Sequence, residues 1–160
     1  MAPDRLRPYR PEDRAACLAV FDSNVPAYFA PHERTDFTDF LDALHGSYFV
    51  MDDADGQVVA CGGFLASRGD PAVAILCWGM VRHGLHRTSR GAHLLSARLD
   101  LIATHSDFVT VTIETSQKSR GFFEHFGFIA GTIVTDGFAP GLDRVEMTLD
   151  LTQRRPTAAP

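Results

Sequence analysis

Residues 72–81, AVAILCWGMV, form an apolar run without a charge that leads through a basic loop into an amphipathic segment. An apolar run of this length between turn residues predicts a strand buried on both faces. Leucines and isoleucine at helical spacing then predict a helix over 89–104, and the alternating segment 107–115 predicts another strand. Strands joined through a helix pair in parallel, so the chain requires at least one parallel strand pair.

The remaining segments predict an α+β domain. We expect further strands at 5–10, 47–53, 57–68, 128–134 and 143–151, and further helices starting at Pro11 and covering 32–44 and 116–126, the last with Ser116 as N-cap. These segments predict a mixed, mostly antiparallel sheet of about seven strands with four helices. We expect one domain over residues 5–151 and a disordered tail over 152–160, TQRRPTAAP, because the tail lacks residues that could pack.

Composition excludes several functional classes. A net charge of −5 over 160 residues argues against a nucleic-acid partner, which would need a broad basic surface. There is no signal peptide or run of membrane-spanning length, so we expect a cytoplasmic protein without a membrane partner. Cys17, Cys61 and Cys77 are odd in number and lack metal or redox spacing, so we expect free thiols and no metal site.

The stretch VRHGLHRTSRGAHLL, residues 81–95, predicts a binding site for an anion such as a pyrophosphate. A strand that enters a helix through a loop points free backbone N–H groups, aided by the helix dipole, at one place. Small residues let the backbone approach a ligand, and Arg87 and Arg90 add positive charge. The alternative is a solvated turn. The Gly-Lys pair of a P-loop and the glycine pattern of a Rossmann fold are both absent.

This stretch resembles the GNAT superfamily of N-acetyltransferases, whose signature is V-x-P-x-x-Q/R-x-x-G-x-G/A-x-x-L. The spacing agrees throughout, with these residues at the six positions: Val81, His83, His86, Ser89, Gly91 and Leu94. Three identities depart from the signature. Ser89 replaces the first glycine, which a negative φ would tolerate, and it could also cap the helix.

A second motif of the superfamily, N-x-x-A-x-x-x-Y-x-x-x-G-F, resembles SQKSRGFFEHFGF. Ser116 stands at the Asn position, Ser119 at the Ala and Phe123 at the Tyr, while Gly127-Phe128 match. The opening LRPYRPEDRAACLAVFD also resembles the first strand and helix of this superfamily. The resemblance covers about residues 5–150 and implies a GNAT-like fold whose parallel strand pair splays apart.

The resemblance implies that the chain binds acetyl-CoA. The backbone of Met80 and Val81 would pair with the pantetheine arm, and an amide there would polarise the thioester carbonyl. The pyrophosphate would lie on His86, Arg87, Thr88, Ser89, Arg90 and Gly91. The arm would be flanked by Ser116, Ser119, Phe122 and Phe123.

The implied reaction is direct attack of a primary amine on the thioester, and it needs a base. Glu114, near the end of the strand beside the cleft, is the best candidate base, although an edge carboxylate facing solvent is an alternative. Phe123, at the position of the family's usual acid, has no proton to give.

Two loops would shape the acceptor pocket, 23–34 and 135–144. We assign Asn24 and Tyr28 to substrate binding. Aromatic and acidic residues in both loops suit a small-molecule or peptide amine, although the aromatics could simply anchor the loops. The leading interpretation is therefore a cytoplasmic GNAT-type N-acetyltransferase, possible as a homodimer. The rival is a non-catalytic acyl-CoA-binding sensor or regulatory module.

Overall fold

The computed structural model describes residues 4–105 and 107–153. The chain forms two compact units, one built from residues up to Leu65 with Cys77–Leu99, and the other from Ala66–Leu76 with the chain from Asp100 onward. Strand β4 (Val73–Val81) and helix α3 (Arg90–Ala103) contribute to both units.

The strands form one seven-stranded sheet in the order β1-β2-β3-β4-β5-β7-β6. In the first unit β1 (Arg5–Pro8), β2 (Ser47–Asp52) and β3 (Val58–Ala66) are antiparallel neighbours. In the second unit Val73–Ile75 of β4 pair in parallel with Thr110–Thr112 of β5 (Thr110–Thr115). The mixed sheet with one parallel pair and four helices confirms the predicted fold class.

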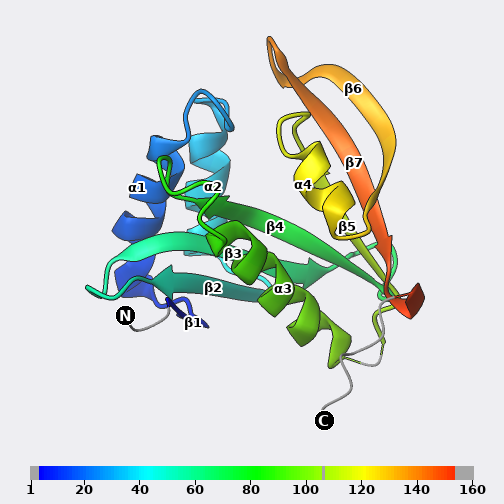
Figure 1. The fold of residues 1–160 in the computed structure, drawn as a ribbon, viewed down its shortest axis with the longest axis horizontal. Helices are drawn as coiled ribbons and strands as arrows, with labels where there is room; N and C mark the ends of the chain where they lie inside the picture. Colours follow the sequence, from blue (N-terminus) through cyan, green and yellow to red (C-terminus); the bar gives the residue numbers. More distant parts are fainter. Residues whose placement is uncertain (1–3, 106, 154–160) are drawn as a thin grey trace. The chain divides into compact units, whose positions relative to one another are not determined.

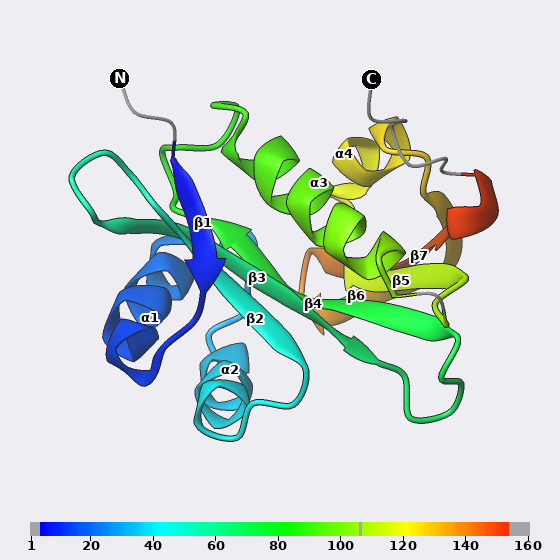
Figure 2. The same cartoon turned by 90° about the horizontal axis from the view of Figure 1, so that it is seen from below.

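Helices cover both faces of the strands in the first unit (Figures 1 and 2). On one face α1 (Arg14–Ser23) and α2 (Glu33–Asp42) pack on β2, β3 and β4 around buried residues such as Phe21, Phe37 and Val50. On the other face Leu94 of α3 packs with Met51. Burial of these apolar side chains is the main stabilising contribution, at about 25 cal/mol per Å² of apolar surface.

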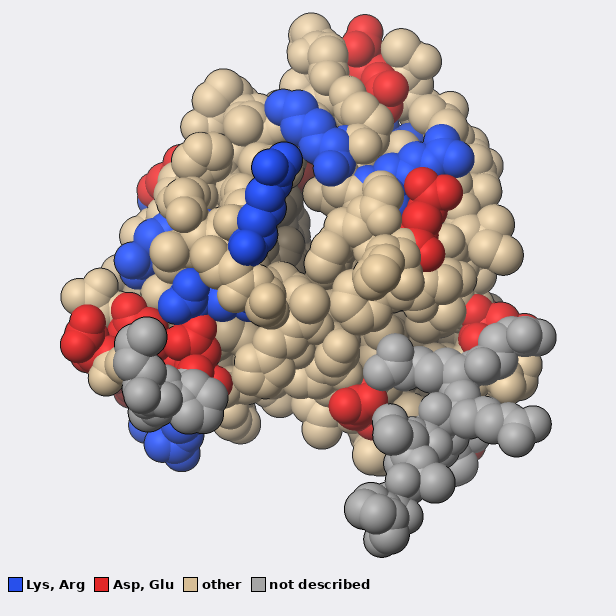
Figure 3. Space-filling model, viewed as in Figure 1, with Lys and Arg blue, Asp and Glu red and all other residues tan. Residues whose placement is uncertain are grey.

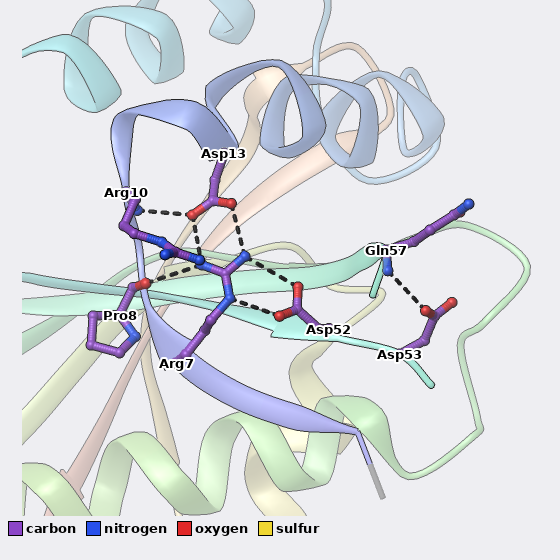
Figure 4. A network of polar contacts seen from close by, with 7 residues as sticks. All are labelled: Arg7, Pro8, Arg10, Asp13, Asp52, Asp53 and Gln57. Atoms are coloured by element: carbon purple, nitrogen blue, oxygen red, sulfur yellow. Dashed lines mark hydrogen bonds and ion pairs between the residues drawn. The ribbon is translucent and has the colours of Figure 1, made fainter. Parts of the chain in front are cut away.

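A partly buried ion-pair network joins the first strand to the turn before α1 (Figure 4). The Arg7 guanidinium donates to Asp13 of the short 3-10 helix η1 (Pro11–Asp13), with an N–O distance of 2.8 Å, and to Asp52 of β2 at 2.7 Å. Asp13 Oδ2 also accepts the Arg10 N–H at 2.8 Å. These contacts hold the pKa of the Asp13 carboxyl below its ordinary value of 3.8, mainly through the Arg7 hydrogen bond.

The second unit contains α4 (Arg120–His125) and the antiparallel strands β6 (Ile129–Ala139) and β7 (Leu142–Asp150) beside β5. The prediction of a helix over 116–126 with Ser116 as N-cap is wrong, because α4 begins at Arg120 with Ser119 as N-cap residue. Residues 116–119 form a turn, and the Gln117 amide bonds the backbone of the β6–β7 hairpin, at Gly141 O and Asp143 N.

The sixth strand is longer than predicted. The sequence TDGFAPGL predicts a loop, whereas β6 continues to Ala139 through a register shift. Asp136 adopts a left-handed φ of 55° there, and its N–H donates to Asp143 Oδ1 at 2.9 Å. The Asp136 carboxylate in turn accepts the Gly141 N–H at 2.7 Å. The turn residues of this segment therefore build a bulge and a tight hairpin.

Beyond β7, Leu151–Gln153 form a short 3-10 helix, η2, and the remainder of the predicted tail, 154–160, lies outside the described residues. None of the helices in the described part of the chain is long and apolar enough to cross a membrane. Basic and acidic side chains both occur across the face of the molecule drawn in Figure 3.

Candidate functional site

The loop that follows β4, residues 82–91, has a backbone suited to holding an anion. Three of its residues adopt left-handed φ angles, Gly84 at 94°, Arg87 at 65° and Ser89 at 68°. From His86 to Arg90 the sign of φ therefore alternates from one residue to the next. Alternation between right- and left-handed conformations turns successive N–H groups toward the same side and creates an anion-binding concavity.

The N–H groups of this loop lack internal partners. Within the described part of the chain, the backbone N–H groups of residues 86–92 donate no hydrogen bond. The last of these residues form the first turn of α3, where the helix dipole places partial positive charge. The loop therefore presents unpaired donors and a helix N-terminus together, as the sequence predicted.

Ser89 adopts a left-handed backbone conformation. A negative φ would have tolerated the serine without strain, but the φ of Ser89 is 68°. This φ is also not the extended conformation of an N-cap residue, although the Ser89 carbonyl accepts the His93 N–H at 2.9 Å. A serine held in this conformation costs roughly 1–2 kcal/mol relative to glycine.

The three arginines of the loop differ in their surroundings. Arg82 donates from Nη2 to the Val58 carbonyl oxygen at 2.8 Å. Arg90 forms an ion pair with Asp4 and also donates to Thr88 Oγ1 at 3.1 Å. Arg87 is exposed and forms no ion pair or hydrogen bond with a described residue, so its guanidinium remains available to an anion.

His86 turns its side chain toward the end of β4. Its Nε2 lies 2.9 Å from the Val81 carbonyl oxygen, and its ring packs edge-on against Tyr28 with centroids 4.8 Å apart. Asn24 Nδ2 donates to the same Val81 oxygen at 2.9 Å. The two side chains occupy both lone pairs of this carbonyl, so His86 contributes its backbone to the loop surface and its side chain to the interior.

The two residues assigned to substrate binding lie in the segment between α1 and α2. Asn24 is only 2% exposed, and its amide ties Val20 of α1 to the end of β4, while its Oδ1 has no hydrogen-bond partner among the described residues. Tyr28 is half-buried against His83 and His86. The geometry places Asn24 inside the first unit and Tyr28 at its margin.

Carboxylates of the two predicted acceptor loops are engaged within those loops. Glu33 accepts the Ala30 N–H at 2.7 Å, and burial raises the pKa of its carboxyl group. Asp136 and Asp143 accept backbone N–H groups of the β6–β7 hairpin. These side chains shape their loops, which agrees with the alternative that loop residues serve an anchoring role.

Strand β4 contains a distortion just before the 82–91 loop. Trp78 has a φ of 47°, which is unusual for a large residue in a strand. Its carbonyl accepts a 2.8 Å hydrogen bond from the hydroxyl of Tyr48, which is buried in β2. Burial is also the main reason that the pKa of the Tyr48 phenol is raised. The neighbouring residues Met80 and Val81 are largely buried.

Glu114 lies near the carboxyl end of β5 in the second unit, and its side chain is exposed. Its register partner on β7 is another acid, Glu146. Like charges directly opposite each other on a sheet repel, so the arrangement is unfavourable for stability. A carboxylate kept there has full access to water and to a ligand.

The other predicted residues of the second unit lie around α4. Ser116 is buried, and its carbonyl accepts the Ser119 N–H at 3.0 Å. Phe123 is 6% exposed and packs edge-on against Phe128, whereas Phe122 is 38% exposed. Phe123 therefore belongs to the core of this unit and Phe122 to its surface.

Tyr48 and Arg98 are absent from the sequence-based assignment of the site. Tyr48 could not be recognised from the sequence, because its contact with Trp78 depends on a distortion of the strand that the apolar run does not indicate. Arg98 could have been recognised, because its charge interrupts the apolar helical stripe of Leu94, Leu95, Leu99 and Ile102. The structure places Arg98 in the interior, at 3% exposure.

Comparisons with known proteins agree with the fold. The family model described as the acetyltransferase (GNAT) family matches residues 17–128. No curated protein sequence matches significantly. Among solved structures, an N-acetyltransferase from Staphylococcus aureus Mu50 has a TM-score of 0.72 at 22% identity, covering 94% of this chain and 99% of that one.

Two further structures share the fold. The ribosomal-protein-S18-alanine N-acetyltransferase from Escherichia coli has a TM-score of 0.76 at 17% identity, with 92% and 94% of the two chains covered. An aminoglycoside 6'-N-acetyltransferase complexed with coenzyme A has a TM-score of 0.74 at 10% identity, with 97% and 99% covered. With its family model matched over most of its length, the chain belongs to the GNAT family of acetyltransferases.

Proposed function

We propose that this protein transfers the acetyl group of acetyl-CoA to a primary amine of a small molecule or peptide. The 82–91 loop is the observation that carries the proposal, because its unpaired N–H groups, the start of α3 and the exposed Arg87 suit a pyrophosphate. A neighbour of the same fold is complexed with coenzyme A, which supports the same ligand here.

The residues that would hold acetyl-CoA are those that the resemblance to the GNAT motifs implies. The backbone of residues 86–91, with Arg87, would bind the pyrophosphate. Met80 and Val81 would lie along the pantetheine arm, and Ser116, Ser119, Phe122 and Phe123 would flank it. Because Asn24 and His86 occupy the Val81 carbonyl, contacts of the arm with this residue would use its N–H group.

When bound, acetyl-CoA supplies a thioester whose acyl carbon accepts the amine nitrogen as the carbon–sulfur bond breaks. Glu114 would take the proton that the amine loses, directly or through a water molecule, since its carboxylate is exposed at the end of β5. Tyr28 would border the acceptor at the margin of the first unit, and Asn24 would hold that segment against β4.

One observation favours the rival function, a non-catalytic acyl-CoA sensor. Phe123 occupies the position of the family's usual acid and is buried in the core around α4, where it offers no proton. General acid assistance is typically worth about 10²–10⁴-fold in rate, so its absence slows a reaction without abolishing it.

Calorimetric titration with acetyl-CoA and CoA tests the proposal, on the wild type, on Ser89→Trp and on Arg68→Trp. Ser89 lies in the loop, while exposed Arg68 in the second unit provides the matched control. We expect micromolar binding that only Ser89→Trp abolishes. No binding to the wild type would overturn the proposal. Binding without thiol release for any amine in a broad panel would favour the sensor.

A further inference from the structure

Arg98 is a buried charge in the middle of an apolar helix face. It lies on α3 in the stripe formed by Leu94, Leu95, Leu99 and Ile102, all of which are buried. Arginine is almost never fully buried unless a partner compensates its charge. The surroundings of Arg98 therefore require an explanation.

Two glycines make room for the Arg98 guanidinium on the α3 face of the strands. A Cβ placed on Gly62 of β3 would lie 3.1 Å from its Cζ, and one placed on Gly79 of β4 would lie 2.8 Å from its Nη2. Side chains at either position would collide with the guanidinium. The charge is therefore set directly against the backbone of β4 at Gly79, next to the bulge at Trp78.

Only weak internal contacts compensate this charge. Nη1 donates to the Gly63 carbonyl at 3.3 Å and Nε to the Leu94 carbonyl at 3.4 Å, both long for hydrogen bonds. Among the described residues no carboxylate forms an ion pair with Arg98. The titratable groups that interact electrostatically with it are Cys77 of β4, Tyr48 of β2 and Cys61 of β3.

Cys77 and Tyr48 are neutral near pH 7 and cannot serve as counter-ions. Burial raises the pKa of the Cys77 thiol to about 12 although the nearby Arg98 charge opposes this, and it raises that of the Tyr48 phenol as well. Burying a cation without a counter-charge costs several kcal/mol, and an apolar side chain of similar size would be more stable there. Arg98 is thus kept at the expense of stability.

We propose that Arg98 supplies the positive charge that stabilises the sulfur of CoA as it departs from the acetyl group. This inference rests on the proposed function, which places the cofactor arm at Met80 and Val81, directly after Gly79. In the transfer the amine nitrogen bonds to the acyl carbon and loses its proton to the base. The sulfur leaves with the electron pair of the broken carbon–sulfur bond and later takes a proton from water.

Phe123 cannot protonate the departing sulfur, so the thiolate needs another source of stabilisation, and the Arg98 charge would provide it. A positive charge near the sulfur favours the thiolate over the thiol, because an opposite charge stabilises the ionised form. Arg98 acts on the sulfur through its field, and we therefore regard it as a charge-stabilising residue rather than a catalytic one.

The test measures the acidity of the CoA thiol in the complex. CoA carrying ¹³C at the carbon bonded to sulfur is titrated with base while bound to the wild type, Arg98→Met and Arg98→Lys, with the ¹³C chemical shift as readout. We expect the thiol bound to the wild type to ionise more than one pH unit below that of free CoA. Arg98→Met should move this value back toward free CoA, and Arg98→Lys should restore part of the effect.

Two further measurements separate this role from a structural one. The affinity of Arg98→Met for CoA should stay within about threefold of the wild type, and its thermal midpoint should not fall, since a buried unpaired charge has been removed. Arg87→Ala is the contrasting variant, expected to weaken CoA binding while leaving the thiol acidity of the complex at saturation unchanged.

The outcomes discriminate clearly. If CoA bound to the wild type ionises like free CoA, the inference is overturned whatever the variants do, including the case in which Arg98→Met does not fold. It is also overturned if Arg98→Met retains the wild-type acidity. If the wild type binds no CoA at all, the proposed function fails and this inference falls with it.

Discussion

The hydroxyl of Tyr48 donates a 2.8 Å hydrogen bond to the carbonyl of Trp78, from one strand of the first unit to another. Trp78 holds a left-handed φ of 47°, which a large side chain adopts only when its surroundings require it. Rings of Phe37 and Phe40 pack against both residues. The bulge in β4 is therefore fixed by a buried hydrogen bond within an aromatic cluster.

Removal of this hydroxyl in Tyr48→Phe should destabilise the protein by about 1–3 kcal/mol, because it leaves the Trp78 carbonyl without a partner in the core. Urea unfolding at pH 7 measures the change. Tyr9→Phe is the matched control, since Tyr9 packs edge-on against Tyr48 but its hydroxyl forms no hydrogen bond with a described residue. We expect less than about 0.5 kcal/mol for the control, and equal effects of the two variants would contradict the assignment.

Relief of the left-handed strain at Ser89 should stabilise the protein. In Ser89→Gly the φ of 68° becomes unstrained, which gains roughly 1–2 kcal/mol, while the greater freedom of glycine in the unfolded chain offsets part of this. We expect a net gain of about 0.5–1 kcal/mol in thermal unfolding. Ser89→Ala keeps the Cβ and should show no gain; a gain of equal size would mean that the serine hydroxyl, not the backbone, causes the effect.

Much of the fold follows from local patterns in the sequence. The uncharged run at 72–81, the helical stripe beginning at Leu94 and the alternation at 107–115 predicted β4, α3 and β5 with their parallel pairing, as observed. The basic loop between them was located correctly for the same reason, because spacing along one strand–loop–helix segment is a local property.

Features that depend on contacts distant in sequence were not predictable. The left-handed backbone at Trp78, which bonds Tyr48, and the tie between Asn24 and Val81 each involve groups from another element. The extension of β6 was missed because Asp-Gly and Pro-Gly indicate a loop. In the structure, hydrogen bonds of the Asp136 N–H and carboxylate hold these residues in a bulge and a hairpin.

The buried pair of Arg7 and Asp13 should make stability depend on acid pH. In Asp13→Asn we expect a loss of about 2–3 kcal/mol at pH 7, somewhat less than for an isolated buried pair because Asp52 still binds Arg7. Since the folded-state pKa of Asp13 is lowered, its contribution is complete above the ordinary value of 3.8 and disappears as the pH falls through the folded-state value. Unfolding free energies of both proteins, measured from pH 7 to pH 2.5, should therefore converge in acid. A constant difference across that range would contradict the role of this charge.

Arg87 and Arg90 of the 82–91 loop should differ in their effect on CoA binding. Arg87 has no partner among the described residues, whereas Arg90 is paired with Asp4. We expect Arg87→Ala to weaken CoA binding about tenfold, corresponding to one hydrogen bond to a charged group, and Arg90→Ala to weaken it less. Calorimetry at about 50 and about 300 mM salt measures the affinity of both variants for CoA. The salt dependence of this affinity should be smaller in Arg87→Ala, because the attraction of the Arg87 guanidinium, which salt screens, is absent. A larger loss in Arg90→Ala would show that the ion pair with Asp4 opens on binding.

A role for Glu114 as base predicts a difference between two acids that face each other across β5 and β7. Glu114→Gln removes the proton acceptor and should lower kcat by about 10²-fold or more at neutral pH, with little change in the affinity for CoA. Glu146→Gln removes the register partner of Glu114 and the same like-charge repulsion, yet should leave kcat within about threefold. Both variants should gain stability slightly, so unfolding measurements confirm that the pair is matched.

Initial rates of CoA release from acetyl-CoA, with an amine that the wild type accepts, measure kcat from pH 5 to pH 9. The acidic limb of the wild-type profile should disappear in Glu114→Gln alone, because that limb reports protonation of the base. If Glu146→Gln loses it as well, the two carboxylates act as a coupled pair and Glu114 is not the base by itself.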